Sequence, residues 1–250
     1  MRSPPPAHDP GPTRRPPRLF VELLCQGTVT LSTGQAHYLT HVLRLGQGAP
    51  LVLFDAAGGE ADAVLLRARG ATLEVEVEAA VTRARGWDLT VALAVPKGER
   101  ADWAVEKLTE VGVARILWLL SERSVVKPER FGARQARLQR IAAAAASQSG
   151  RVGLPEIVGP MRFEEFLTLS AEHRLIADMS GEPMQSWLST PSPRVVLLGI
   201  GPEGGFAAVE LEAAERAAFH RCRLGANTLR IETAAVVGAA MILGQTGRPA

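Results

Sequence analysis

The sequence predicts an α/β protein in two parts, a strand-rich N-terminal part and a C-terminal part with a mostly parallel sheet. Residues 73–78 read Leu-Glu-Val-Glu-Val-Glu, an alternation typical of a half-buried antiparallel strand. From residue 87 onward, apolar runs alternate with helical segments, which is the pattern of strand–helix units. With 250 residues, of which 46% are apolar, the chain can bury a sizeable core.

The N-terminal elements are predicted as a tail followed by a small β-barrel. Residues 1–17 hold seven prolines and almost no apolar bulk, so we expect a disordered tail. Residues 18–82 form the barrel domain, and residues 83–86 form a linker. Its expected strands are residues 19–24, 51–54, 60–67 and 72–81, and its expected helix is residues 35–45.

The C-terminal domain is predicted to span residues 87–250. Gly112 fits the position just past the end of an amphipathic helix. The expected strands are residues 89–95, 116–120, 174–179, 195–200 and 221–224, and the expected helices are residues 100–111, 130–147, 207–218 and 234–245.

Composition excludes several classes of protein. The formal net charge of +2 is too small to indicate a nucleic-acid partner by itself, and only three of the 28 basic residues are lysines. Cys25 and Cys222 do not form a C-x-x-C pair, which argues against a disulfide framework or a cysteine zinc site. The sequence shows neither a membrane-length apolar run nor the apolar core of a signal peptide, so we expect a cytoplasmic protein.

Two glycine-bearing loops near the C-terminus carry the strongest functional signal. The first follows a buried strand and reads Gly199-Ile200-Gly201-Pro202-Glu203-Gly204-Gly205-Phe206, and the second begins at Leu224-Gly225. Each loop feeds a helix, and in parallel sheets ligands bind beyond the carboxyl ends of the strands. We therefore expect the two loops to form two walls of one pocket.

Two other interpretations of the first loop stay open. Gly199, Gly201 and Gly204 satisfy G-x-G-x-x-G, the dinucleotide fingerprint. Pro202 removes one N–H that would hold a pyrophosphate, and too little chain follows for the remaining βαβ units. The loop could also be a tight structural turn.

Several motifs, in order along almost the whole chain, resemble the RsmE-type methyltransferases of the SPOUT superfamily. The departures are Val111 for leucine, Ile231 for threonine and Asp178 for glutamate. The motifs are residues 18–21, 37–45, 96–100, 107–113, 122–124, 147–151, 201–206, 224–225 and 229–234.

This resemblance implies a PUA-like RNA-binding barrel, a SPOUT domain with a trefoil knot, and a homodimer. It also implies transfer of a methyl group from S-adenosylmethionine to N3 of a uridine in small-subunit (16S) ribosomal RNA. Backbone groups and apolar side chains of the two loops would hold the cofactor. The expected cofactor-binding residues are Leu198, Gly199, Ile200, Gly201, Gly204, Gly205, Leu224, Gly225, Asn227, Leu229 and Thr233.

The same resemblance suggests the catalytic groups. Uridine N3 is mostly protonated at neutral pH, so a base or a stabiliser of the developing anion would help the reaction. Arg230 is the candidate stabiliser, and Glu232 would orient Arg230 or act as the base. The alternative is a structural ion pair at a helix start. Glu203 is expected to cap the following helix rather than to act in catalysis.

Arginines supply the candidate RNA contacts, because a guanidinium group suits phosphate. Seven basic residues and one acid lie between residues 123 and 151, and a solvated helix face is the alternative interpretation. The candidates are Arg18, Arg44, Arg123, Arg130, Arg134, Arg137 and Arg151.

His37 and His41 have a spacing that metals use, but no third ligand is near in sequence, so we predict no metal.

The sequence leaves three hypotheses for the function of the protein: a ribosomal RNA uridine-N3 methyltransferase, a non-catalytic RNA-binding ribosome assembly factor of the same fold, and a nucleotide-dependent oxidoreductase.

Overall fold

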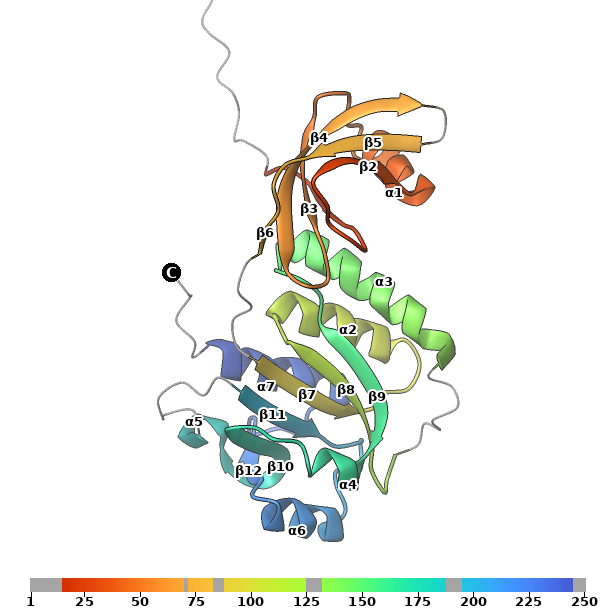
Figure 1. Ribbon diagram of the computed structural model, residues 1–250. Helices are drawn as coiled ribbons and strands as arrows, with labels where there is room; N and C mark the ends of the chain where they lie inside the picture. The colour runs from red at the N-terminus through yellow and green to blue at the C-terminus, as the bar shows by residue number, and fades with distance from the viewer. Residues whose placement is uncertain (1–14, 70–71, 83–87, 125–131, 188–194, 245–250) are drawn as a thin grey trace, which may run out of the picture.

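The computed structural model contains two β-sheets, one from each half of the chain (Figure 1). It describes residues 15–69, 72–82, 88–124, 132–187 and 195–244. The predicted tail, apart from its last three residues, and the predicted linker lie outside these ranges. Among the described residues, no helix is long and apolar enough to cross a membrane.

The N-terminal sheet has the strand order β1-β3-β4-β5-β2, with β6 paired to β4. The β1–β3 pair is parallel and the other pairs are antiparallel. Its elements are β1 (Arg18–Phe20), β2 (Gly27–Leu31), α1 (Thr33–His37), η1 (Tyr38–Val42), β3 (Pro50–Phe54), β4 (Gly59–Arg69), β5 (Thr72–Val77) and β6 (Val81–Thr82).

The alternation that predicted β5 is confirmed, since Leu73, Val75 and Val77 are buried and Glu76 is exposed. The strand β2 was missed. The single helix predicted for residues 35–45 is wrong in form, because α1 passes directly into the π-helical turn η1. The described pairings run from β1 at one edge to β2 at the other, and they contain no pair that closes the sheet into a barrel.

The C-terminal sheet has the order β12-β10-β11-β7-β8-β9, and every neighbouring pair is parallel. Its strands are β7 (Asp88–Ala94), β8 (Arg115–Leu120), β9 (Glu156–Arg162), β10 (His173–Pro183), β11 (Val195–Ile200) and β12 (His220–Arg223). Its helices are α2 (Arg100–Val111), α3 (Gly132–Ser149), α4 (Phe163–Phe166), α5 (Met184–Trp187), α6 (Ala208–Arg216) and α7 (Ile231–Gly244).

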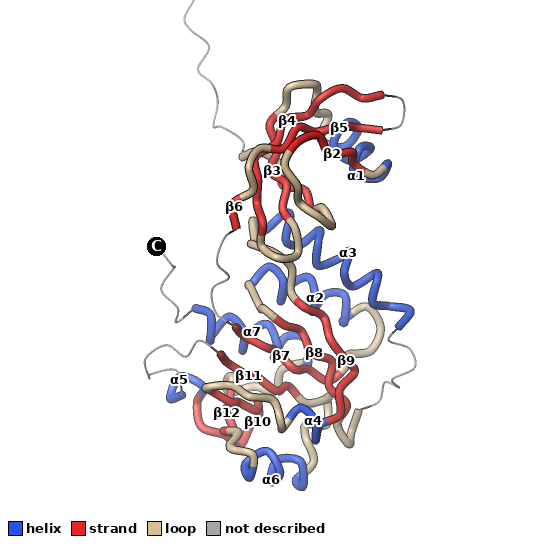
Figure 2. Tube along the Cα trace, viewed as in Figure 1, coloured by secondary structure: helices blue, strands red, loops and turns tan. Residues whose placement is uncertain are grey.

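Helices cover both faces of this sheet (Figure 2). Apolar side chains of α2, α3 and α7 form one core with Leu89, Val91 and Leu93, while α4 and α6 form another with Ala92 on the opposite face. The alternation along β7 therefore divides its side chains between two cores, as expected for a parallel strand buried on both faces.

The helix α2 has the bounds expected from the sequence, and Gly112 ends it with φ 106°. Strand β9 was missed because Gly159 and Pro160 usually interrupt a strand. Pro160 is tolerated here because β9 lies at the edge of the sheet, where a proline can lack its backbone N–H without removing a hydrogen bond between strands. The short helices α4 and α5 were also missed.

Arginine contacts join the two halves of the chain where α3 lies between the sheets (Figure 1). The Arg18 guanidinium donates to the carbonyl of Arg151 over 3.1 Å, pairs with Glu60 at 3.0 Å and lies 4.9 Å from the centre of the Phe54 ring. Arg151 in turn donates to the carbonyls of Thr109 and Gly153. These contacts hold the N-terminal sheet against the C-terminal domain.

Candidate functional site

A pocket of about 280 Å³ lies beside residues 177–179 of β10 and at the carboxyl ends of β11 and β12, where the sequence placed the two glycine loops. Parallel sheets bind ligands at this edge. The pocket is lined by Ala177, Asp178, Met179, Ile200, Gly201, Pro202, Glu203, Gly204, Gly205, Cys222, Leu224, Gly225, Asn227, Thr228, Leu229, Ile231 and Ala234.

The first loop is a tight turn that depends on glycine. A Cβ atom at Gly201 would lie 3.0 Å from Cδ2 of Phe206 and 3.1 Å from its backbone nitrogen, so a side chain there would clash. Gly205 has φ 67°, and its N–H donates to the carbonyl of Pro202 over 2.8 Å. The backbone itself therefore forms this wall of the pocket.

The predicted cofactor residues divide into two groups. Ile200, Gly201, Gly204, Gly205, Leu224, Gly225, Asn227 and Leu229 line the pocket. Leu198, Gly199 and Thr233 do not.

Packing explains two of these exceptions. Gly199 faces the Phe166 ring, and Leu198 is fully buried against Gly238 of α7, where an added Cβ would come within 2.6 Å of a Leu198 methyl group. The strand residues just before the loop thus serve the core rather than the pocket.

Charge in the lining was not foreseen from the sequence. Among the lining residues, Asp178 and Glu203 are acidic and none is a lysine or arginine. The Asp178 Oδ1 atom accepts hydrogen bonds from the Ser180 N–H, over 2.9 Å, and from the Ser180 hydroxyl. The available signal was the position of Asp178 near the end of the predicted strand 174–179, although β10 continues to Pro183. The resulting pocket has a negative wall and suits a cationic ligand.

Cys222 lies at the floor of the pocket and is fully buried. Burial, together with the charge of Asp178, raises the pKa of the Cys222 thiol to about 12. The thiol is therefore protonated at neutral pH and contributes an apolar, weakly nucleophilic surface.

The two predicted catalytic residues flank the start of α7. Arg230 is exposed and directly precedes the helix, where its carbonyl accepts from the Ala234 N–H. Glu232 is buried, and its Oε1 atom lies 3.8 Å from the Arg100 Nε atom. Among the described residues, the ion pair of Glu232 is thus with Arg100 and not with Arg230, and its Oε2 atom is buried without a hydrogen-bond partner.

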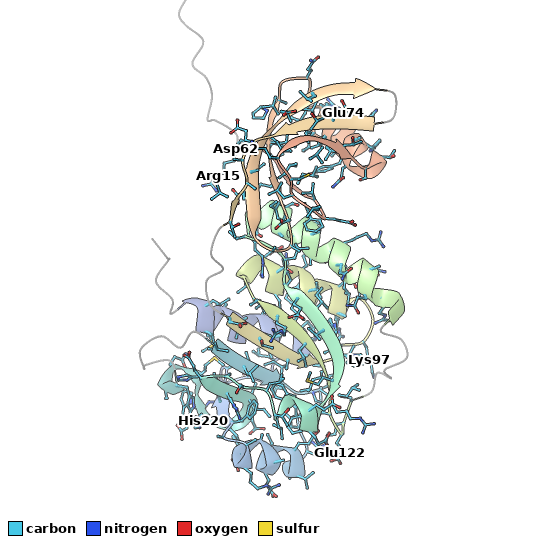
Figure 3. All side chains as sticks on the ribbon, viewed as in Figure 1. Arg15, Asp62, Glu74, Lys97, Glu122 and His220 are labelled. Atoms are coloured by element: carbon cyan, nitrogen blue, oxygen red, sulfur yellow. The ribbon has the colours of Figure 1, made fainter. Side chains whose placement is uncertain are left out.

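Glu210 was missed, although it fixes the loops around the pocket. Its two carboxylate oxygens accept from the backbone N–H groups of Glu122 and Ala207, each over 2.8 Å. Figure 3 labels Glu122 in the lower part of the C-terminal domain. The expected cap by Glu203 is wrong, because Glu203 is exposed and Glu210, in the first turn of α6, takes that role.

The candidate RNA arginines also divide into two groups. Arg44, Arg123 and Arg137 are exposed, and Arg134 is half-buried. Arg123 donates to the carbonyl of Gly204 over 2.7 Å, so it borders the pocket, while Arg137 pairs with Asp102 at 2.5 Å.

Arg18 and Arg151 instead use their guanidinium groups within the chain, as described above. Arg130 lies outside the described residues. Contacts within the chain limit what Arg18 and Arg151 can offer to a phosphate.

The rings of His37 and His41 stack on one another, with centroids 4.5 Å apart and planes 9° apart. Within the described ranges, no group of three or more histidine, cysteine, aspartate or glutamate side chains is placed to hold a metal ion.

Comparison with known proteins agrees with this architecture. Residues 84–243 match the family described as RNA methyltransferase domain, and residues 31–78 match the RNA methyltransferase PUA domain. The ribosomal RNA small subunit methyltransferase E of Synechocystis is 33% identical over 230 residues, which cover 88% of this chain and 74% of that protein. The protein of the same name from Bacillus subtilis is 26% identical and covers 92% and 96%.

Solved structures show the same fold. A Legionella pneumophila methyltransferase with bound SAM superposes with a TM-score of 0.83 at 29% identity, covering 92% of this chain and 98% of that one. The Neisseria gonorrhoeae ribosomal RNA small subunit methyltransferase E, bound to S-adenosylmethionine, gives a TM-score of 0.81 at 28% identity with the same coverage.

The parallel α/β domain, its looped pocket and the preceding sheet together define an RNA methyltransferase architecture. The chain belongs to the RNA methyltransferase family that contains the ribosomal RNA small subunit methyltransferases E.

Proposed function

We propose that this protein transfers a methyl group from S-adenosylmethionine to N3 of a uridine in small-subunit ribosomal RNA. The observation that carries the proposal is the pocket formed by the two glycine loops, in a chain whose structural neighbours are solved with S-adenosylmethionine bound. Family membership supports the reaction class, and the resemblance of the motifs supports N3 of uridine as the methylated atom.

The lining fits the cofactor in two respects. Turns with exposed backbone groups offer hydrogen bonds to an adenine edge, and Leu224 and Leu229 offer apolar contact to its faces. The acids Asp178 and Glu203 suit a ligand with a positive sulfonium and a positive amino group. When bound, S-adenosylmethionine supplies an electrophilic methyl group. The chain's task is to place uridine N3 in line with that group.

Arg230 is the proposed stabiliser of the negative charge that develops on the uracil as the N3 proton leaves. Its exposure beside the pocket leaves it accessible to RNA. Because Glu232 is paired with Arg100, we propose that Glu232 fixes the first turn of α7, and with it the position of Arg230, rather than contacting Arg230 directly.

Several finer features complete the proposal. We propose that residues 18–82 act as a PUA-like barrel that binds RNA and that residues 87–250 are the catalytic domain, threaded as a trefoil knot. The enzyme works without a metal, in the cytoplasm, as a homodimer whose site is completed across the interface.

RNA contacts are proposed at Arg44, Arg123, Arg134 and Arg137, with Arg130 a further candidate. Arg123 is the strongest of these, because its hydrogen bond to Gly204 places it at the edge of the pocket. Arg18 and Arg151 are proposed to act on RNA indirectly, by holding the two halves of the protein together.

Incubation with tritiated S-adenosylmethionine and small subunits that lack the modification tests the function. Digestion of the RNA and nucleoside analysis are expected to yield labelled 3-methyluridine. A protein that binds the cofactor and the subunits but yields no labelled nucleoside would instead be a non-catalytic assembly factor. Calorimetry that shows binding of dinucleotides in preference to S-adenosylmethionine would point to an oxidoreductase.

A further inference from the structure

The π-helical turn η1 presents an ordered aromatic surface that the proposed reaction does not use. His37 and His41 are both exposed, yet their rings are stacked nearly parallel at 4.5 Å. Tyr38 in the same turn has 43% of its surface exposed. π-Helical turns are rare and frequently lie at functional sites. The turn stands at the outer end of the N-terminal sheet, next to α1 (Figure 1).

A short hydrogen-bond chain fixes this surface. The Thr40 hydroxyl donates its one hydrogen to the carbonyl of Ala36 over 2.8 Å. The contact of 2.8 Å between Thr40 Oγ1 and His41 Nδ1 must then be a bond in which Nδ1–H donates. The hydrogen bond at Nδ1 therefore fixes the orientation of the His41 ring, and the His37 ring covers one face of the His41 ring. Exposed side chains are seldom held in this way without a reason, because ordering them costs conformational entropy.

The chain segment that carries the turn is free of acidic residues. Residues 23–54 contain no aspartate or glutamate, and they contain Arg44 together with the two histidines. Arg44 is exposed and follows η1 with a positive φ of 56°. An aromatic surface in an acid-free segment beside an arginine matches a nucleotide, since a nucleobase stacks on rings and a phosphate binds a guanidinium group.

We propose that His37, Tyr38 and His41 form a stacking platform for an unpaired nucleobase of the RNA substrate, with Arg44 beside it for the adjoining phosphate. The platform rests on the proposed function, because it needs an RNA substrate. It contacts a nucleotide other than the one that is methylated, since His37, Tyr38 and His41 belong to the N-terminal half of the chain and none of them lines the cofactor pocket. Stacking tolerates any base, so the platform selects single-stranded RNA rather than a sequence.

Metal binding explains the histidines less well. Stacked, nearly parallel rings direct their in-plane lone pairs side by side rather than toward one point, and the Nδ1 atom of His41 is already engaged by Thr40. A single ion would therefore have to separate the two rings.

Binding of a single-stranded RNA decamer that contains 2-aminopurine tests the platform. The variant His37→Ala/His41→Ala is expected to bind it about tenfold more weakly than wild type and to lose the fluorescence quenching that reports stacking. The matched control His37→Phe/His41→Tyr keeps two rings and is expected to stay within about twofold of wild type. Affinity for S-adenosylmethionine is unchanged in both variants, which shows that the protein is folded.

Three outcomes would overturn the platform. Wild-type binding by the double alanine variant would show that the rings are not used. Equal weakening in the aromatic variant would show that the imidazoles act by hydrogen bonding or charge instead of stacking. Failure of the wild-type protein to bind any single-stranded RNA would remove the platform, and all three outcomes leave the proposed function to the separate assay with small subunits.

Discussion

The Arg100 Nε atom lies 3.8 Å from the Glu232 Oε1 atom, so an ion pair joins the start of α2 to the first turn of α7. The Glu232 side chain is 9% exposed and the Arg100 side chain 43%. A nearly buried carboxylate is costly without a partner, so this pair fixes where α7 begins. Arg230, one residue before the helix, does not take part in that contact.

Replacing Arg230 tests whether this side chain stabilises the transition state of methyl transfer. We expect Arg230→Ala to lower the rate of methyl transfer by about 100-fold, the usual effect of losing a group that stabilises transition-state charge. Its melting temperature and affinity for S-adenosylmethionine stay at wild-type values, because the side chain is exposed and outside the pocket lining. Arg216→Ala on the exposed face of α6 is the control and keeps full turnover. A fully active Arg230→Ala protein would exclude Arg230 from the reaction.

Gly201→Val tests the backbone wall of the pocket. The new Cβ would lie 3.0 Å from Cδ2 of Phe206 and 3.1 Å from its backbone nitrogen, and valine adds two methyl groups to that atom, so the turn must move. Calorimetry is expected to show loss of S-adenosylmethionine binding. Gly46→Ala serves as the control, because its added Cβ meets no atom within 4 Å and Gly46 does not line the pocket. If Gly201→Val bound the cofactor normally, the first loop would not form part of the cofactor-binding site.

The charge of Asp178 is expected to distinguish the cofactor from its demethylated product. S-adenosylmethionine carries a sulfonium charge that S-adenosylhomocysteine lacks, and Ser180 holds Asp178 in the pocket wall. Asp178→Asn should therefore weaken binding of the sulfonium compound more than binding of the product. The expected difference is about fivefold, which corresponds to about 1 kcal/mol for a partly exposed charge pair. Equal weakening of both ligands in calorimetry would show a hydrogen-bonding role instead.

Local patterns predicted much of this fold because they are set by neighbouring residues. The bounds of α2 follow from its apolar stripe and from Gly112, and the pocket follows from glycines placed after buried strands. Patterns fail where tertiary contacts decide. Strand β9 contains a proline that only an edge position permits.

The same limit applies to the site. The partner of Glu232 lies on another helix more than a hundred residues away, and nothing local to Arg18 indicates that its guanidinium group reaches Arg151. Sequence patterns located the pocket but could not assign these long-range partners.

Glu210→Ala should destabilise the protein through two backbone groups. The N–H groups of Glu122 and Ala207 would both lose their acceptor, and each unsatisfied group that stays buried costs about 1–3 kcal/mol. We expect a loss of about 2 kcal/mol in the free energy of unfolding, measured by denaturant titration. Glu212→Ala, exposed on the same helix, is the control with no expected change. Equal stability of the two variants would show that solvent replaces the Glu210 contacts.

Because the thiol of Cys222 is buried, we expect it to cause a specific loss of stability in alkaline solution. The pKa of its thiol is about 12 in the folded protein against a reference value of 9.0, so the folded state retains a proton that the unfolded state releases between these values. Stability from this group is complete below pH 9.0 and falls as the pH rises toward about 12, by up to about 1.4 kcal/mol per pH unit. Other groups titrate in the same range, so the measurement is the difference in unfolding free energy between wild type and Cys222→Ala at pH 8 and at pH 10.5. The wild-type protein should lose more stability over that interval, and parallel pH profiles would show that the thiol ionises in the folded protein as easily as in the unfolded chain.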